Sequence, residues 1–365
     1  MSKIDKNIKN KIIHGNCIDI LKNIENNSVD VIFADPPYNL QLQNPLNRPN
    51  NTSVNGVNDT WDKFDSFEKY DTFNHDWLHE SRRVLKDTGT LWVIGSYHNV
   101  FRLGYILQNL GFWILNDIIW QKTNPMPNFR GKRFTNAHET LIWCSKDKNQ
   151  KKYTFNYNAM KTLNDDLQMR SDWNIPLCRG KERIKIDGKK AHPTQKPEAL
   201  LSRVILSSTK QNDLILDPFS GTGTTAAVAK KLNRNFIAIE KDLEYIKISR
   251  KRLMEIKSHD AEILNITPSK RTLPRVPFGS IVEQGLLKPG SIIFDYRKKY
   301  YAKVRADGSL VSSKSSVSIE GSIHKVGASL QGTPACNGWT FWHYETKNGP
   351  TSIDTLRQKI RSKTT

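Results

Sequence analysis

Residues 214–225 read LILDPFSGTGTT, an apolar run that passes directly into a glycine-rich turn. The residues that follow, 226–232, have the pattern of a short helix. Glycines allow a tight turn and a close approach of the backbone to a ligand, and the start of a helix offers unpaired N–H groups to a carboxylate. No Gly-Lys-Ser/Thr triplet follows, which excludes a Walker-type loop. The stretch therefore predicts a strand, turn and helix that bind a nucleoside-type cofactor.

A carboxylate stands at the end of the next apolar run, residues 235–239, in the form of Glu240. It follows the glycines by about 20 residues, the position from which an acidic side chain accepts hydrogen bonds from ribose hydroxyls. The two signals together are far more specific than a glycine turn alone. The cofactor residues predicted from these segments are Asp217, Pro218, Phe219, Gly221, Gly223, Thr224 and Glu240.

Further apolar runs, among them 29–34 and 90–94, alternate with helical patterns over the first 255 residues. Such alternation is typical of an open, mostly parallel sheet with helices on both faces. Each run ends where a polar or glycine-rich motif begins, and ligands of doubly wound sheets bind outside the carboxyl ends of the strands. We therefore predict an α/β, doubly wound, Rossmann-like fold with the functional site at that edge.

The second motif, Asp35-Pro36-Pro37-Tyr38, follows the predicted strand 29–34 directly. Two successive prolines fix the backbone and remove N–H donors, so the Asp35 carboxylate and the Pro36 carbonyl can face one cleft as acceptors. The exocyclic amine of a base is a weak nucleophile because its lone pair is delocalised into the ring. Two acceptors on its hydrogens would localise that lone pair toward an electrophilic methyl group, and Tyr38 adds a face for stacking. The predicted catalytic residues are Asp35, Pro36, Pro37 and Tyr38.

The order of the two motifs, DPPY before the glycine motif, resembles the β class of DNA amino-methyltransferases. Longer stretches are similar to the cell-cycle-regulated and HinfI-type adenine methyltransferases, namely IFADPPYNLQL (32–42), WVIGSYHN (92–99), NPMPNF (124–129) and AHPTQKP (191–197). This resemblance covers nearly the whole chain. It implies a seven-stranded methyltransferase sheet, S-adenosylmethionine as methyl donor, and N6 of adenine within GANTC as the target, with a role linked to DNA replication and the cell cycle.

The resemblance also implies cofactor residues outside the glycine motif. Lys196 is expected near the carboxylate of the donor, and Asp35 is expected beside the donor as well as the base. Gly15-Asn16-Cys17 is similar to the Gly-Asp-Cys that the family places near the cofactor's adenine, which adds Asn16 and Cys17. Asn16 departs from the family's Asp but keeps a hydrogen-bonding side chain.

A base inside a duplex is unreachable, so we expect the target to be extruded into a pocket where it stacks on Tyr38. The Asn- and Pro-rich segment 39–60 is predicted to be a loop that supplies apolar wedges and polar groups to the DNA, and segment 122–134 is a similar loop. Their basic residues suit phosphates. The predicted DNA contacts in these loops are Asn39, Leu40, Gln41, Leu42, Asn124, Arg130, Lys132 and Arg133.

The chain is predicted to hold a methyltransferase domain over residues 1–256, a Pro-rich basic linker over 257–277 and a small α+β domain over 278–365. The formal net charge is +20, and the residues from 269 onward carry 16 Lys/Arg against 6 Asp/Glu. This density of positive charge predicts double-stranded DNA as the partner. Its predicted DNA contacts are His324, Lys325, Asn337 and Trp339, although Trp339 and Trp342 are equally compatible with a domain core. Homodimer formation is the main alternative role for this domain.

Other functional classes are disfavoured by the sequence. No apolar run is long enough to span a membrane and the N-terminus lacks a signal peptide, so we expect a cytoplasmic, nucleoid-associated protein. The four cysteines form no CxxC pair, and no metal site is predicted. No Pro-Cys dipeptide is present for C5-cytosine chemistry. Two alternatives stay open: an N4-cytosine DNA methyltransferase, and a DNA-binding regulator without turnover.

Overall fold

The computed structural model describes residues 8–40, 46–47, 53–54, 62–128, 131–186, 188–265, 275–314, 317–347 and 349–362. The chain divides into two compact units, residues 1–268 and 269–365. The boundary falls inside the segment that the sequence predicts to be a linker.

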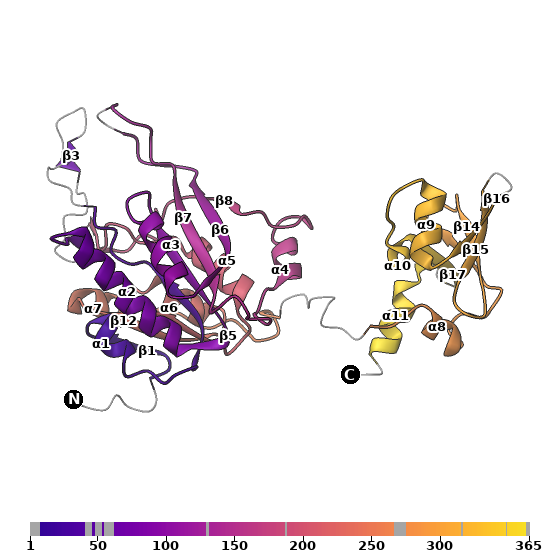
Figure 1. The fold of residues 1–365 in the computed structure, drawn as a ribbon, viewed down its shortest axis with the longest axis horizontal. Coiled ribbons are helices and arrows are strands. Elements are labelled where there is room, and N and C mark those ends of the chain that lie inside the picture. The colour runs from indigo at the N-terminus through magenta and orange to yellow at the C-terminus, as the bar shows by residue number, and fades with distance from the viewer. Residues whose placement is uncertain are drawn as a thin grey trace. The chain divides into compact units, whose positions relative to one another are not determined.

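The first unit is built on a central sheet with helices packed around it (Figure 1). The sheet has eight strands in the order β1-β12-β11-β2-β5-β7-β6-β8. From β1 to β5 all neighbouring strands are parallel, β7 is antiparallel to both of its neighbours, and β8 is again parallel to β6. The strands are β1 (Lys11–His14), β2 (Val29–Ala34), β5 (Leu85–Gly95), β6 (Trp113–Lys122), β7 (His138–Ser145), β8 (Asp172–Ile175), β11 (Leu214–Asp217) and β12 (Asn235–Glu240). Two short ribbons are separate from it: β3 (Leu46–Asn47) with β4 (Ser53–Val54), and β9 (Lys185–Ile186) with β10 (Lys189–Lys190).

The predicted fold class is confirmed, but the sheet has one strand more than the seven that the resemblance implies. The additional edge strand is β8, which pairs with residues 119–122 of β6. It forms because Trp173 and Ile175 bury their side chains in the same apolar cluster as Trp120 of β6. A strand of four residues with only two apolar side chains has too little pattern to be detected in the sequence.

Helices cover both faces of the sheet. Ile32 and Ala34 of β2 face a cluster that includes side chains of α1, α2 and α3, whereas Val31 and Phe33 face α5, α6 and α7. This alternation is the pattern of a strand buried on both sides. The helices are α1 (Cys17–Leu21), α2 (Phe67–Val84), α3 (Val100–Asn109), α4 (Tyr157–Thr162), α5 (Glu198–Ser208), α6 (Thr224–Lys231) and α7 (Leu243–Glu255).

The functional edge is set by the pairing of β2 with β11, in which Val31 lies opposite Ile215 and Ile32 opposite Leu216. Because the strands are parallel, the residues that follow them emerge side by side although they are far apart in the sequence. The helix after β2 is α2 on one face, and the helix after β11 is α6 on the other. A ligand cleft forms at such a switch point.

The second unit is an antiparallel sheet of six strands in the order β16-β15-β14-β13-β17-β18, with short helices packed on it. The expected α+β character is confirmed. Its elements include β13 (Ile292–Asp295), β14 (Tyr301–Val304) and α11 (Asp354–Arg361). The others are α8 (Gly279–Glu283), β15 (Leu310–Lys314), β16 (Val317–Gly321), α9 (Ile323–Gln331), α10 (Gly338–Phe341), β17 (Trp342–Thr346) and β18 (Gly349–Ser352).

Three observations concern the described residues as a whole. None of their helices combines the length and apolarity needed to cross a membrane. All four cysteines are free thiols. Within the same ranges, no group of three or more His, Cys, Asp or Glu side chains is arranged to hold a metal ion.

Candidate active site

A cavity of about 370 Å³ lies at the carboxyl ends of β2 and β11. This volume is in the range of small-molecule and cofactor sites. Every residue predicted to be catalytic or cofactor-binding lines it, with the single exception of Gly223. The cavity therefore brings together two motifs that lie far apart in the sequence.

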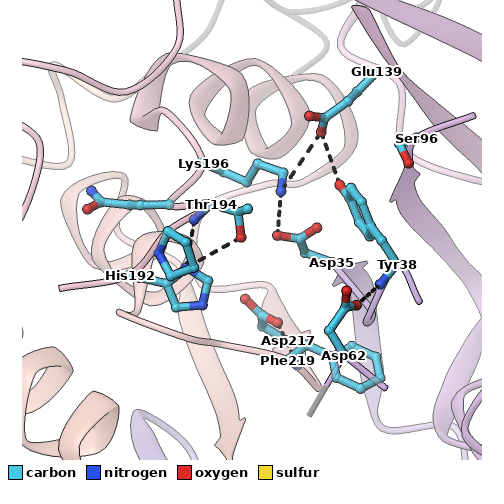
Figure 2. A network of polar contacts seen from close by, with 12 residues as sticks. Asp35, Tyr38, Asp62, Ser96, Glu139, His192, Thr194, Lys196, Asp217 and Phe219 are labelled. Atoms are coloured by element: carbon cyan, nitrogen blue, oxygen red, sulfur yellow. Dashed lines mark hydrogen bonds and ion pairs between the residues drawn. The ribbon is translucent and has the colours of Figure 1, made fainter. Parts of the chain in front are cut away.

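Asp35 lies at the floor of this cavity, directly after β2. Its Oδ2 accepts a hydrogen bond from Nζ of Lys196 at 2.7 Å, while Oδ1 is buried and has no hydrogen-bond donor among the described residues (Figure 2). Burial raises the pKa of Asp35, and the ammonium of Lys196 opposes that shift. One oxygen is thus held by the protein and the other is available to a ligand.

Tyr38 is held through its hydroxyl, which donates to Oε2 of Glu139 at 3.0 Å. The other oxygen of Glu139 pairs with Nζ of Lys122 at 2.8 Å, and Nζ of Lys196 lies 5.2 Å from the centre of the Tyr38 ring. The two ammonium groups lower the pKa of Glu139 against the effect of burial. Burial, followed by the carboxylates of Asp35 and Glu139, raises the pKa of Tyr38 well above its usual value, so the hydroxyl stays a donor.

The backbone of the Asp-Pro-Pro-Tyr motif is fixed from a second direction by Asp62. Its carboxylate accepts three consecutive backbone N–H groups, from Tyr38 at 2.6 Å, Asn39 at 2.8 Å and Leu40 at 2.9 Å. Asn39 adopts a left-handed conformation with φ of 54°, which turns these donors toward one point. The hydroxyl of Tyr70 donates to the Pro37 carbonyl at 2.8 Å. The carbonyl of Pro37 is therefore occupied within the protein.

The glycine motif forms the turn that the sequence predicts, and α6 begins at Thr224. Gly223 precedes the helix in a left-handed conformation with φ of 73°, and a Cβ atom there would lie 2.9 Å from the side chain of Ser249. Asp217 accepts the backbone N–H of Phe219 at 2.9 Å, and its burial raises its pKa to about 7. The turn is packed too tightly at residue 223 for any side chain.

Glu240, at the end of β12, holds the same turn from the next strand. Its Oε2 accepts the N–H of Gly221 at 2.7 Å, and its Oε1 accepts the N–H groups of Lys241 at 2.8 Å and Asp242 at 2.9 Å. A carboxylate has about four lone-pair sites, so three such bonds leave room for one more donor. The position of Glu240 matches the prediction. Its hydrogen bonds to backbone N–H groups could not be predicted from the sequence.

The N-terminal segment contributes Asn16 and Cys17 to the cavity. Asn16 caps helix α1, because its side chain accepts the N–H of Ile18 at 2.9 Å. Asn and Asp serve equally well at this position, which explains why the departure from the family's Asp is tolerated. Burial raises the pKa of Cys17 to about 12, so the thiol is not a nucleophile.

The His-Pro-Thr-Gln-Lys-Pro stretch contributes His192, Thr194, Gln195 and Lys196 to the lining of the cavity. His192 packs on Tyr245 with ring centres 4.8 Å apart, and burial lowers its pKa to about 4, so the ring is neutral at physiological pH. Lys196 was predicted to face the carboxylate of the donor. In this structure its ammonium bonds to Asp35, and since an ammonium has three donors, both contacts are compatible.

The residues predicted to contact DNA in the first unit have different environments. Asn39 is 7% exposed, and Oδ1 of Asn124 accepts the N–H of Leu177 at 2.8 Å, so both have roles within the fold. Lys132 and Arg133 are exposed. Leu40 lines the cavity. Three others, Gln41, Leu42 and Arg130, lie outside the described residues.

In the second unit, His324, Lys325 and Asn337 are exposed, as a DNA contact would require. Trp339 is not, and its predicted role in stacking on DNA is corrected here. It is 7% exposed, packs edge-on to Phe278 and is covered by the guanidinium of Arg357, 4.3 Å from a ring centre. Trp342 is fully buried. Both tryptophans belong to the core because a small domain needs large apolar side chains to fill it.

Sequence reasoning missed Glu139 and Asp62. Glu139 stands near the start of β7, where the sequence shows only an apolar run preceded by His-Glu, and Asp62 follows the polar loop without a motif of its own. Each reaches the site only because the chain folds back over it. Only the burial of these two acidic side chains distinguishes them from ordinary surface residues. Burial cannot be determined from the sequence before the fold is known.

Comparison with known proteins agrees with this geometry. The DNA methylase family N6_N4_Mtase matches residues 29–251, and the family described as Restriction Enzyme Adenine Methylase Associated matches residues 258–365. The type II methyltransferase M.HinfI of Haemophilus influenzae is 50% identical over 351 residues, which are 95% of this chain and 96% of that protein.

Two further relatives cover the first unit. The type II methyltransferase M2.MboI of Moraxella bovis is 47% identical over 253 residues, 69% of this chain and 89% of that protein. The crystal structure of M1.HpyAVI in complex with S-adenosylmethionine matches with a TM-score of 0.50 and 28% identity, covering 67% of this chain and 98% of that one. Because a relative with half of its residues identical matches nearly end to end, the chain belongs to the N6/N4 family of S-adenosylmethionine-dependent DNA methylases and is a HinfI-like type II DNA methyltransferase homologue.

Proposed function

We propose that this protein transfers a methyl group from S-adenosylmethionine to N6 of adenine in duplex DNA. The observation that carries the proposal is the buried Oδ1 of Asp35, which has no donor among the described residues and lies in the cavity shared with the glycine motif. A buried acceptor without a partner is costly unless a ligand supplies the donor. An exocyclic amine is such a donor.

The chain's own residues supply orientation and acceptors. Oδ1 of Asp35 takes one N–H of the amine, and the neighbouring carbonyl of Pro36 takes the other, which localises the nitrogen lone pair. Tyr38 stacks on the extruded base and excludes water. S-adenosylmethionine, when bound, supplies an electrophilic methyl group. No residue of this chain needs to form a covalent intermediate.

The donor is proposed to lie along the carboxyl ends of β11 and β12. Glu240 has one lone-pair site left for a ribose hydroxyl, and the turn at Gly221 and Gly223 allows a close backbone approach. Asn16 and Cys17 face the adenine end, and Lys196 and Asp217 face the methionine end. The apolar wall of Pro218 and Phe219 and the start of α6 at Thr224 complete the set.

Adenine is preferred over cytosine for two reasons. Residue 35 is Asp, where N4-cytosine enzymes more often carry Ser, and the second unit matches a family whose description names adenine methylases. The rival activity is N4-cytosine methylation, because the chemistry at the two exocyclic amines is the same. GANTC as the site, a homodimer and a role in the cell cycle rest on the resemblance and are part of the proposal.

The experiment combines product identity with site specificity. Tritium-labelled S-adenosylmethionine is incubated with unmethylated duplexes that contain GANTC or a permuted sequence, and the labelled nucleosides are separated after digestion. Label in N6-methyladenine from the GANTC duplex is expected. Label in N4-methylcytosine would establish the rival activity. Retention of DNA in a gel without any transfer would indicate a regulator without turnover.

A further inference from the structure

Four charged side chains, Asp35, Lys122, Glu139 and Lys196, form one buried network at the cavity. Figure 2 shows how Asp35, Glu139 and Lys196 lie within it. Lys196 pairs with Asp35 at 2.7 Å, Lys122 pairs with Glu139 at 2.8 Å, and Glu139 lies 3.9 Å from Lys196. Their side chains are between 8% and 19% exposed. Two positive and two negative charges balance, and Glu139 is the member that contacts both halves.

Stability alone does not explain this network. Charges taken out of water lose hydration that their pairing only partly restores, and well-packed apolar residues often do as well or better in such places. Glu139 nevertheless sits in the β7 strand, whose following residues Leu141 to Ser145 are all buried. Its partners Tyr38 and Lys196 both line the cavity, whereas Glu139 itself does not. Through these two partners, the network contacts residues that line the cavity.

We propose that Glu139 is a positioning residue for methyl transfer, which acts on the target base through Tyr38 and Lys196. The inference rests on the proposed function, because it concerns how the same cavity receives the amine. Glu139 has no direct contact with the base or with the donor in this scheme.

The first route runs through Tyr38. The hydroxyl has one donor, given to Oε2 of Glu139 at 3.0 Å, which restricts rotation of the ring. The ammonium of Lys196 lies 5.2 Å from the ring centre. A ring that is tethered at its tip presents a fixed plane to an extruded base, and the base then reaches Asp35 at a defined angle.

The second route runs through Lys196. The attraction of Glu139 keeps the ammonium on the Oδ2 side of Asp35, so that Oδ1 remains open to the amine. Without the charge at residue 139, Asp35 becomes the only carboxylate in contact with Lys196. The ammonium is then free to move across the carboxylate and compete with the amine for Oδ1.

The test compares Glu139→Gln with a matched control, Glu80→Gln. Glutamine keeps the shape and an acceptor for Tyr38 but removes the charge. Glu80 is similarly shielded, with a side chain 14% exposed against 12% for Glu139, and it pairs with Arg83 at 2.7 Å on α2, outside the cavity lining. Single-turnover transfer of label to unmethylated duplex DNA should fall at least tenfold in Glu139→Gln and stay within twofold in Glu80→Gln. The Kd for S-adenosylmethionine should stay within threefold in both.

A pH profile separates positioning from mere structural support. The groups that face Asp35 are the ammonium of Lys196, the carboxyl groups of Glu139 and Asp217 and the neutral hydroxyl of Tyr38, and among these Glu139 raises the pKa of Asp35. Removal of the Glu139 charge should lower the pKa of Asp35 and move the acid limb of the single-turnover rate to lower pH. Tyr38→Phe removes a hydrogen bond that lowers the pKa of Asp35, so this variant should not move the limb to lower pH. Glu139→Asp keeps the charge but is one methylene shorter. This variant replaces Glu139→Gln in the single-turnover assay if Glu139→Gln does not fold.

The outcomes are distinct. Wild-type protein that transfers no label to DNA would overturn the proposed function and this inference together. An active wild type with an unchanged rate in Glu139→Gln would overturn the inference alone. A loss of rate accompanied by an equal loss of cofactor affinity, with no shift of the acid limb, would reduce Glu139 to a structural residue.

Discussion

At the scale of single residues, the strongest expectation concerns Asp35. Asp35→Ala removes the acceptor proposed for the target amine and should lower methyl transfer by roughly 100-fold or more, in line with the loss of one preorganised polar group at a reacting centre. Binding of S-adenosylmethionine should survive, because the glycine turn and Glu240 are untouched. Tritium transfer to DNA and calorimetric titration of the cofactor measure the two quantities. Loss of both together would contradict the separation of roles and point to misfolding.

The raised pKa of Asp217 leads us to expect that the stability of the protein depends on pH. Burial raises this pKa to about 7 from the usual value of 3.8, so the folded state keeps a proton that the unfolded state has released. The free energy of unfolding of the cofactor-free protein therefore falls as pH rises from about 4 to 7. Asp217→Asn removes this effect and should gain stability relative to wild type by a few kcal/mol at pH 8, since one pKa unit corresponds to about 1.4 kcal/mol.

Thermal melts of the cofactor-free proteins at pH 5 and pH 8 check this prediction. The variant should exceed the wild type by a larger margin at pH 8 than at pH 5. An equal margin at both values would mean that Asp217 ionises normally in the folded state.

Residues within a continuous motif were predictable, and residues brought in by the fold were not. Asp35, Tyr38 and the glycines stand in short segments whose chemistry can be read from neighbouring residues. Glu139 and Asp62 become part of the site only when β7, which pairs with β5, and the segment before α2 come near the end of β2. Trp339 shows the opposite error, because an aromatic residue among basic ones suits either a DNA surface or a small core, and the choice depends on burial.

At the scale of elements, the carboxylate of Asp62 fastens the chain that leaves β2. Asp62→Ala would leave three backbone N–H groups at residues 38–40 without their acceptor, which should lower the free energy of unfolding by about 1–3 kcal/mol. The rate of methyl transfer should fall as well, because Tyr38 loses its backbone anchor. Urea denaturation and single-turnover assays measure the two effects.

Asp65→Ala is a suitable control for this change. Asp65 lies three residues further along and pairs with Lys69, with both side chains largely exposed. Such pairs contribute little, so its removal should leave stability and transfer nearly unchanged. Equal effects of the two substitutions would show that the three bonds to Asp62 are not important.

The turn before α6 allows a second test at this scale. Gly223→Ala combines a left-handed backbone with a Cβ placed 2.9 Å from Ser249, and we expect a clear loss of cofactor affinity and of thermal stability. Gly180→Ala has the same backbone penalty, at φ of 62°, with no atom within 4 Å of the new Cβ. Its cost should be limited to about 1–2 kcal/mol, the penalty of the conformation alone. Similar losses in both variants would mean that the contact with Ser249 relaxes freely.

The strands β2, β5, β11 and β12 were predicted because each contains a continuous apolar run, whereas β7, also within the sheet, was not predicted. Edge elements were predicted poorly, as β8 shows, since a strand paired on one side needs fewer apolar residues. The start of β5 was also missed, because Leu85 to Gly89 joins the strand through a polar segment with an irregular register opposite β2. Pattern alone gives no sign of such pairing.

For the protein as a whole, truncation after the first unit tests whether the second unit contributes to DNA binding. A chain ending at residue 268 keeps all the described residues of the cavity and loses 16 Lys/Arg and 6 Asp/Glu. It should bind S-adenosylmethionine normally but bind DNA more weakly, with a shallower dependence of affinity on salt, because fewer phosphates are neutralised. Fluorescence anisotropy between 50 and 200 mM salt, a range over which about three to five decades of affinity can be lost, measures the slope. An unchanged slope would assign the second unit to self-association instead.

The pairing of β1 with β12 has a consequence for how the enzyme is made. β1 leaves the ribosome well before β12, its neighbour in the sheet, which ends at Glu240, and β11 must be inserted between β12 and β2. A nascent chain therefore holds Asp35 long before it holds the glycine turn and Glu240, which complete the cavity. Polypeptides released before residue 240 lack the glycine turn or the carboxylate of Glu240, so every premature product carries an incomplete cavity.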